Sequence, residues 1–264
     1  YDKEGIGHVV NLEKGDIVPG SLFVHSDPQA TLAGGVGAYY TNGGRLGSCV
    51  MEAYATGQIT LCVPETFRIE INGTLPENVC GKDVWYKVLG DIDPDGAFGT
   101  ILEYAGTAID QMSVESRMIL CGCAGFCGSD GAILQSDEKT QAWYEDNFGI
   151  EVDQIRSDPD AKFAKVLTYD ASEFVPMVAV PPEVYTTKPV REVENVKIDQ
   201  CIIGTCAGGT LEDLRTAAKI LEGKHIADGV RFIVSPVTQR VYAQASREGL
   251  LATLTEAGAQ VLCA

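Results

Sequence analysis

The sequence has no long apolar run and few basic residues. No stretch reaches the ~18 consecutive apolar residues of a membrane-spanning helix, so we expect no membrane segment. Twenty Lys and Arg residues stand against 37 Asp and Glu residues, which gives a formal net charge of −17. Because no basic stripe could displace counterions from a polyanion, we expect no nucleic-acid partner. The acidity favours solubility, and an anionic substrate would need a locally positive pocket.

Three further patterns are missing from the sequence: a signal peptide, an internal repeat, and a G-x-G-x-x-G turn that follows a strand. The missing glycine turn disfavours a Rossmann-type dinucleotide-binding protein. The chain begins at Tyr1 rather than at Met and enters patterned sequence at once. We interpret this beginning as truncation at the front.

The nine cysteines are an odd number in a long chain, which does not resemble the disulfide framework of a secreted protein. A reducing cytoplasm fits this usage better, and most of these thiols should be small buried hydrophobic groups. Cys121, Cys123 and Cys127 form a C-x-C-x3-C pattern that could hold a metal. Because spacing alone is a weak metal signal, we favour a packed, glycine-rich loop.

The periodicity of apolar residues predicts an α/β protein with mainly parallel sheets, because strands and helices alternate along the chain. We divide it into three parts, 1–62, 63–182 and 183–264, with an irregular, proline-containing connector over 152–182. The run of small residues over 31–44 predicts close backbone packing. The expected strands are 21–25, 67–72, 100–104, 200–203, 230–234 and 259–263, and the expected helices are 46–58, 81–90, 137–147, 212–221, 240–248 and 250–257.

One cysteine occupies a position suited to metal binding. The segment from Ile202 to Arg215 leads from an apolar strand through a turn of small residues, which carries Cys206, into a helix. Backbone N–H groups and a helix N-terminus at such a turn favour the thiolate, which is the form that binds metal.

Several segments resemble the aconitase / 3-isopropylmalate dehydratase large-subunit family, and they occur in family order across nearly the whole chain. They are Gly5-Ile6-Gly7-His8, Val63-Pro64-Glu65-Thr66, Ile101-Leu102-Glu103-Tyr104-Ala105-Gly106, Ser113-Val114-Glu115-Ser116-Arg117-Met118 and Ile198 through Arg215. The resemblance implies three-layer α/β/α domains with mainly parallel sheets. It also implies a hydro-lyase that acts on a hydroxy di- or tricarboxylic acid, similar to 3-isopropylmalate dehydratase.

The resemblance further implies a [4Fe-4S] cluster with Cys206 as its first ligand. In the family the other two ligands form a C-x-x-C pair about sixty residues later, an arrangement suited to iron–sulfur ligation. The fourth iron acts as a Lewis acid on the substrate, and a serine on a small subunit or swivelling domain takes the proton. Since the chain ends at Ala264, we expect an internal fragment that is inactive by itself.

Catalytic and substrate-binding residues follow from the same resemblance. His8 matches a histidine that lines the substrate pocket, Asp27 matches the aspartate of the family's ADSHT motif, and Glu103 matches a strand carboxylate near the iron-bound water. We therefore expect catalytic roles for these three. Gln29 and Arg45 are candidates for substrate binding, because an amide can hydrogen-bond a hydroxyl and a guanidinium can bind a carboxylate through two hydrogen bonds.

The chain also departs from the family pattern. Pro28 and Gln29 replace the serine and histidine of the ADSHT motif, and a glutamine cannot act as a general acid. Gly122 and Phe126 replace an asparagine and a glutamate, and Ala207-Gly208 replace Thr-Asn beside Cys206. The alternative is therefore a catalytically degenerate member with a binding or regulatory role.

Overall fold

The computed structural model describes residues 4–42 and 48–263, and the chain forms two compact units. Unit 1 combines Tyr1–Glu13 with Asn195–Ala264, and unit 2 comprises Lys14–Glu194. The boundary that we expected near residue 63 falls inside unit 2, whereas that near residue 183 lies close to its end. The three-part division stays a prediction, and each unit is described below by itself.

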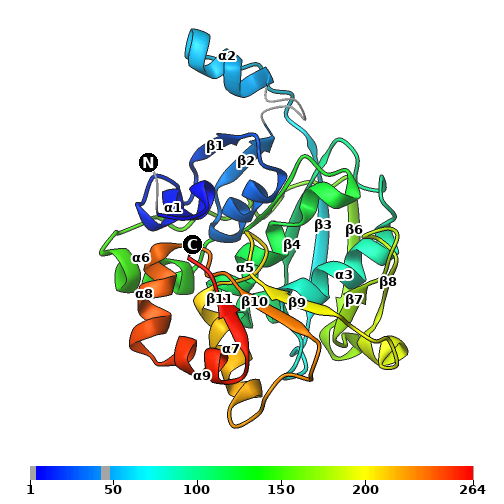
Figure 1. Ribbon diagram of the computed structural model, residues 1–264. Coiled ribbons are helices and arrows are strands. Elements are labelled where there is room, and N and C mark those ends of the chain that lie inside the picture. The colour runs from blue at the N-terminus through cyan, green and yellow to red at the C-terminus, as the bar shows by residue number, and fades with distance from the viewer. Residues whose placement is uncertain (1–3, 43–47, 264) are drawn as a thin grey trace. The chain divides into compact units, whose positions relative to one another are not determined.

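Unit 1 contains a parallel sheet with strand order β11-β10-β9 (Figure 1). Residues Phe232, Val234 and Ala259 of this sheet pack with Leu214 of α7 and Leu254 of α9 in one apolar core. The bounds are β9 (Gln200–Ile203), β10 (Arg231–Val234), β11 (Ala259–Val261), α1 (Gly7–Glu13), α7 (Leu211–Leu221), α8 (Gln239–Arg247) and α9 (Leu250–Glu256). The sequence predicted each strand and each of the helices α7 to α9 to within two residues at either end.

Local sequence explains where α7 begins. The Thr210 hydroxyl accepts a hydrogen bond from the backbone N–H of Asp213 at 3.2 Å, and Asp213 Oδ2 accepts one from the backbone N–H of Thr210 at 3.0 Å. This capping box satisfies two backbone donors that the first helical turn would otherwise leave without partners. Leu214, Ala217 and Ala218 then lie on the buried face of α7, as their helical spacing predicts.

Unit 2 is built on a four-stranded parallel sheet with strand order β5-β4-β3-β6. Its strands are β3 (Glu65–Asn72), β4 (Thr100–Ala105), β5 (Gly131–Leu134) and β6 (Lys165–Asp170). A two-stranded parallel sheet pairs β1 (Leu22–His25) with β2 (Tyr39–Asn42), and an antiparallel one pairs β7 (Met177–Ala179) with β8 (Thr187–Pro189). The expectation of mainly parallel sheets in an α/β fold is therefore confirmed.

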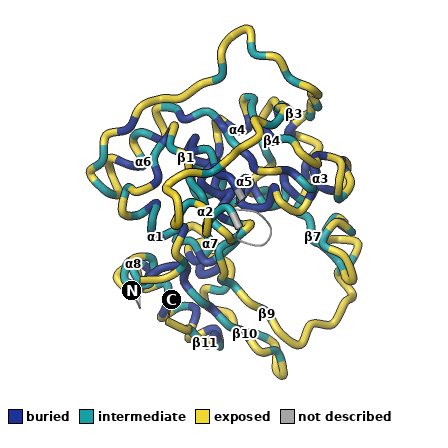
Figure 2. The backbone as a smooth tube through the Cα atoms, turned by 90° about the horizontal axis from the view of Figure 1, so that it is seen from above, coloured by how far each residue is buried: buried dark blue, intermediate teal, exposed yellow. Residues whose placement is uncertain are grey.

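The helices of unit 2 follow the strands in alternation. They are α2 (Ser48–Thr56), α3 (Gly81–Ile92), α4 (Thr107–Gln111), α5 (Val114–Cys121) and α6 (Glu138–Phe148), with 3-10 helices η1 (Pro28–Val36), η2 (Ala124–Cys127), η3 (Ala171–Glu173) and η4 (Val190–Val193). Helices α3 and α5 pack against each other, and α5 is drawn among buried segments in Figure 2. No helix within residues 4–42 and 48–263 has the length and apolarity that crossing a membrane requires.

Glycines allow η1 to lie directly on the backbone of its neighbours. A β-carbon at Gly34 would come within 1.7 Å of the Ala132 carbonyl oxygen, and one at Gly35 would come within 2.4 Å of the Met118 α-carbon. Only residues without a side chain allow such contact. The predicted close backbone packing over 31–44 is thus confirmed for η1.

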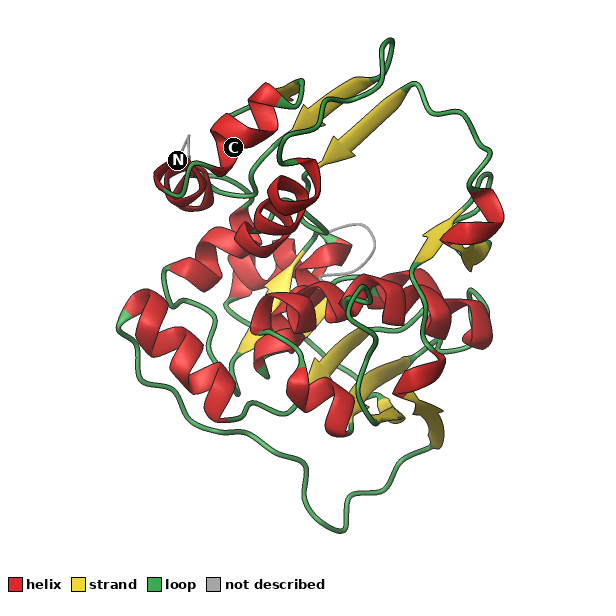
Figure 3. Cartoon of the chain, turned by 90° about the horizontal axis from the view of Figure 1, so that it is seen from below, coloured by secondary structure: helices red, strands yellow, loops and turns green. Residues whose placement is uncertain are grey.

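The connector that we expected over 152–182 is wrong in part, because it contains β6, η3 and β7. Strand β6 is a sheet edge that pairs with β3 only, and most of its side chains are exposed. Its sequence, Lys-Val-Leu-Thr-Tyr-Asp, therefore lacks the apolar character of a buried parallel strand. The preceding residues, 149–164, form a long loop that is green in Figure 3.

A buried ion pair joins three elements of unit 2. The Arg117 side chain on α5, 1% exposed, donates to both carboxylate oxygens of Asp137, at 2.9 and 2.7 Å. It also donates to the backbone oxygens of Ile109 and Asp110. Partial burial by itself would raise the pKa of Asp137, but hydrogen bonds from Arg117 and Thr140 outweigh it and lower the pKa to about 2.

Replacing Asp137 by Asn should destabilise unit 2 by about 3 kcal/mol, because it leaves the Arg117 charge buried and unpaired. Glu138→Gln is the matched control. The side chain of Glu138 is 81% exposed and lies 3.8 Å from Arg156, so its loss should cost less than about 0.5 kcal/mol. Urea unfolding monitored by circular dichroism measures both.

The pH dependence of the same variants provides a second measurement. A carboxyl whose pKa is lowered on folding stabilises the protein fully above its unfolded pKa of about 3.9, and the stabilisation disappears as the pH falls towards about 2. The stability difference between the unmodified chain and Asp137→Asn should therefore shrink over this interval. A constant difference from pH 5 to pH 2 would contradict the assignment.

Candidate functional site

Cys206 lies in a tight turn of unit 1, between β9 and α7, and is half-buried. The preceding residue, Thr205, has a φ of 69°, which is rare for a side chain other than glycine. Its hydroxyl accepts a hydrogen bond from the backbone N–H of Ala207 at 3.3 Å. The backbone is therefore strained immediately before Cys206.

A backbone bridge connects this turn with the segment that carries His8. Val237 donates its N–H to the Gly209 oxygen at 3.0 Å, and its own oxygen accepts the N–H of Ile6 at 3.1 Å. Gly5 also pairs with Thr238. The fold thus brings two predicted site residues, about two hundred positions apart, into one unit. His8 is 1% exposed on α1.

The donor set around Cys206 fits part of a metal centre. Within residues 4–42 and 48–263, no three His, Cys, Asp or Glu side chains are grouped so that they could hold a metal ion. Cys206 offers one half-buried thiol at a turn, which suits a single thiolate ligand. A cubane cluster needs further thiolates besides this one.

Asp27 and Gln29 lie in unit 2, at the turn between β1 and η1. Asp27 Oδ1 accepts the N–H of Gln29 at 2.8 Å and so caps η1, while its own N–H donates to His25 Nδ1 at 2.9 Å. The Tyr40 hydroxyl, opposite on β2, donates to the backbone oxygen of Asp27 at 2.8 Å and lies 3.2 Å from that of His25. The Asp27 turn is therefore held from three sides.

His25 is a residue that the sequence analysis did not single out. Partial burial lowers its pKa below the usual value, against the opposing effect of the Asp27 carboxylate. Because Nδ1 accepts the backbone N–H of Asp27, the proton of the neutral ring lies on Nε2. Residues 14–194 contain no other histidine. Gln29 replaces the family histidine, and His25 is the histidine closest to that position in the sequence. The sequence feature that could have indicated this contact is the position of His25 two residues before Asp27.

Glu103 is 5% exposed on β4 of unit 2. It accepts a hydrogen bond from Arg68 at 2.5 Å, and the Ser157 hydroxyl lies 3.0 Å from each of its carboxylate oxygens. These partners explain how the charge is tolerated in the interior without any catalytic role. The predicted role of Glu103 in catalysis stays a prediction.

Three of the positions that depart from the family pattern lie at the Asp27 turn. A β-carbon at Gly122 would lie 3.5 Å from the backbone oxygen of Gln29, and one at Gly125 would lie 3.7 Å from the Pro28 ring. Phe126 stacks against Trp85, with ring centroids 5.5 Å apart. Three of these departures, at Pro28, Gln29 and Gly122, therefore lie side by side. Arg45 lies outside the described residues.

The thiols of Cys121, Cys123 and Cys127 are buried and form no disulfide. Burial raises the pKa of Cys121, and it raises that of Cys127 to about 11, so both stay protonated at neutral pH. Protonated thiols are poor metal ligands. The interpretation as a packed loop therefore accounts for these cysteines. Within the described residues, none of the nine cysteines forms a disulfide.

Parallel α/β units, one of which carries the half-buried Cys206 thiol at a strand-to-helix turn, define the class of protein. The model of the aconitase family (aconitate hydratase) matches residues 2–192 and 182–264. The chain belongs to this family.

Two of the most similar curated relatives are large subunits of 3-isopropylmalate dehydratase. Subunit 1 of Methanopyrus kandleri is 42% identical over 263 residues, which cover 99% of this chain and 62% of the relative. The subunit of Heliobacterium modesticaldum is 42% identical over 258 residues, which cover 97% and 61%. The chain thus spans about three-fifths of the length of these relatives.

A solved structure supports the fold. The holo-form of Thermococcus kodakaraensis aconitase X aligns with a TM-score of 0.54 over 93% of this chain and 56% of that one. Because the two sequences are only 14% identical, this likeness concerns the fold alone.

Replacing Tyr40 by Phe should lower the free energy of unfolding by about 1 kcal/mol, because the Asp27 turn loses the hydroxyl that binds its backbone. Tyr39→Phe is the matched control, since the described structure has no hydrogen bond from that hydroxyl. It should change stability by less than about 0.5 kcal/mol. Equal effects of the two changes in urea unfolding would show that the Tyr40 hydroxyl does not hold the turn.

Proposed function

We propose that the chain is part of a [4Fe-4S]-dependent hydro-lyase that acts on a hydroxy di- or tricarboxylic acid, in the manner of 3-isopropylmalate dehydratase. The observation that carries the proposal is the Cys206 turn, which Val237 links to the His8 segment in a chain 42% identical to named dehydratase subunits. We also propose a small subunit or swivelling domain as its partner and the cytoplasm as its location.

In this proposal Cys206 supplies one thiolate ligand, and His8 contacts the substrate. When bound, the cluster would supply a Lewis acid for the departing hydroxyl. Asp27 would accept a hydrogen bond from the substrate, since its turn is held rigidly and its carboxylate is half-buried. Gln29 and Arg45 would bind the substrate, and Glu103 stays a candidate for catalysis. By itself the 264-residue chain would be inactive.

A second candidate is a catalytically degenerate member of the family with a binding or regulatory role. The Asp27 turn favours it, because the amide of Gln29 and the ring of Pro28 cannot transfer protons. Phe126 favours it as well, because its ring packs on Trp85 where the family carries a carboxylate.

The test uses the longer parent protein, reconstituted with iron and sulfide without oxygen and compared with its Cys206→Ser variant. We expect a cubane cluster by electron paramagnetic resonance in the parent. In the variant the iron content should fall at least ~3-fold, because one thiolate ligand is lost. Cys201→Ser is the matched control, since its half-buried thiol lies on β9 rather than at the turn, and the cluster should survive.

Hydration of maleate, citraconate and isopropylmaleate then separates the two candidates. Turnover that depends on Cys206 would support the hydro-lyase. A cluster without turnover on any of the three would favour the degenerate member. A parent that forms no cluster, or a Cys206→Ser variant that keeps it, would overturn the assignment of Cys206.

A further inference from the structure

A polar pocket lies in unit 2, away from the Asp27 turn. It occupies about 200 Å³ beside the carboxyl ends of β4 and β5, and its lining includes Arg68, Ile109, Asp110, Arg117, Leu134 and Gln135. Ligands of parallel α/β sheets commonly bind beyond the carboxyl ends of the strands. Asp110 and Gln135 also border an adjoining pocket that includes Lys139 and Arg156.

The helix η1 separates this pocket from the Asp27 turn. Asp27 caps its beginning, whereas Gly37 at its end lies against Ser136, the neighbour of Gln135. Nine residues of 3-10 helix at ~2.0 Å per residue place the two ends roughly 18 Å apart. The pocket therefore lies apart from the Asp27 turn within unit 2.

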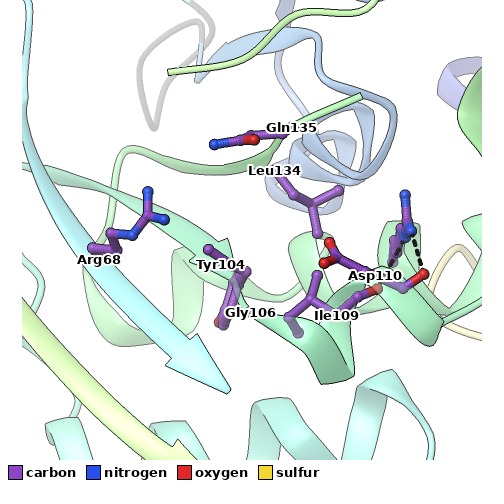
Figure 4. Close-up of a pocket in the computed structure, with 9 residues that line it drawn as sticks. Arg68, Tyr104, Gly106, Ile109, Asp110, Leu134 and Gln135 are labelled. Atoms are coloured by element: carbon purple, nitrogen blue, oxygen red, sulfur yellow. Dashed lines mark hydrogen bonds between the residues drawn. The ribbon is translucent and has the colours of Figure 1, made fainter. Parts of the chain in front are cut away.

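Three side chains bring polar groups into the pocket that the described part of the chain does not use. Arg68 has five N–H groups, of which one binds Glu70 at 2.9 Å and one binds Glu103. The other three have no acceptor there. The Gln135 amide makes no hydrogen bond, and the Asp110 carboxylate accepts none, within the same described residues. Figure 4 shows Arg68 and Asp110 on opposite sides of the pocket, with Gln135 between them.

The charges around the pocket sum to a negative value. Asp137 pairs with Arg117, two carboxylates (Glu70 and Glu103) pair with Arg68, and the Asp110 carboxylate adds a further negative charge. Since no net positive charge remains, the pocket would contribute little to the binding free energy of a dianion or a phosphate. A ligand that carries both signs would match the donors on one side and the carboxylate on the other.

Apolar side chains complete the pocket. Ile109 and Leu134, 2% and 3% exposed, form part of its wall. We propose that the pocket binds a small zwitterion with a short apolar side chain, an α-amino acid of about the size of valine. Its carboxylate would accept hydrogen bonds from Arg68 and Gln135, its ammonium group would bind Asp110, and its side chain would contact Ile109 and Leu134.

The test is isothermal titration of the 264-residue chain with L-valine, L-valinamide, N-acetyl-L-valine and succinate. Valinamide lacks the carboxylate, the acetylated compound lacks the ammonium group, and succinate carries only negative charge. We expect saturable binding of L-valine and at least ~10-fold weaker binding of the others, because each loses a charged hydrogen bond.

Asp110→Asn should weaken L-valine binding at least ~10-fold, whereas Asp146→Asn should leave it unchanged. Both carboxylates are exposed and accept no hydrogen bond in the described structure, so both variants should fold normally. Gln135→Ala is a second variant, expected to weaken binding ~3-fold or more. No saturation by about 10 mM L-valine, tighter binding of succinate, or equal binding by the Asp110→Asn variant would overturn the proposal.

Discussion

Close backbone contact between η1 and its neighbours is the constraint on which the candidate site of unit 2 depends. Gly34 and Gly35 let η1 lie against the backbones of β5 and α5 with no side chain between them. Any larger residue at either position would push the elements apart, since the added atoms would overlap main-chain atoms that cannot move aside. The Asp27 turn at one end of η1 and the pocket near Gln135 at the other both take their positions from this contact.

Electrostatics in unit 2 follows from the same packing. Charged side chains in a protein interior are tolerated only when they are paired. Arg68 with Glu103 and Arg117 with Asp137 satisfy this condition, and the second pair joins α5 to the beginning of α6. Glu103 therefore has a structural role in the fold, whatever its part in catalysis. Arg68, which lines the pocket, has N–H groups that make no hydrogen bond within the described residues.

Unit 1 presents a different arrangement, in which distant parts of the chain meet through backbone hydrogen bonds. Val237 binds both the Cys206 turn and the segment before His8. The proposed ligand and the proposed pocket histidine thus depend on one short segment ahead of α8. In the Asp27 turn, by contrast, amide and apolar groups replace the family's acid–base residues. This difference between the units is why both a hydro-lyase and a degenerate family member are proposed.

The sequence alone predicted the strands of unit 1 and the helices α7 to α9 to within two residues, because alternating strands and amphipathic helices have distinct periods, but it did not predict α1. Ordered motifs also indicated the aconitase family, and the glycine run predicted close packing. The exposed edge strand β6 was missed, since its polar sequence carries no strong period. Only the tertiary structure showed the contact of the Tyr40 hydroxyl with the Asp27 turn, the ion pair at Glu103 and the pocket near Gln135. These depend on which residues from distant segments meet, and that is decided by packing rather than by local sequence.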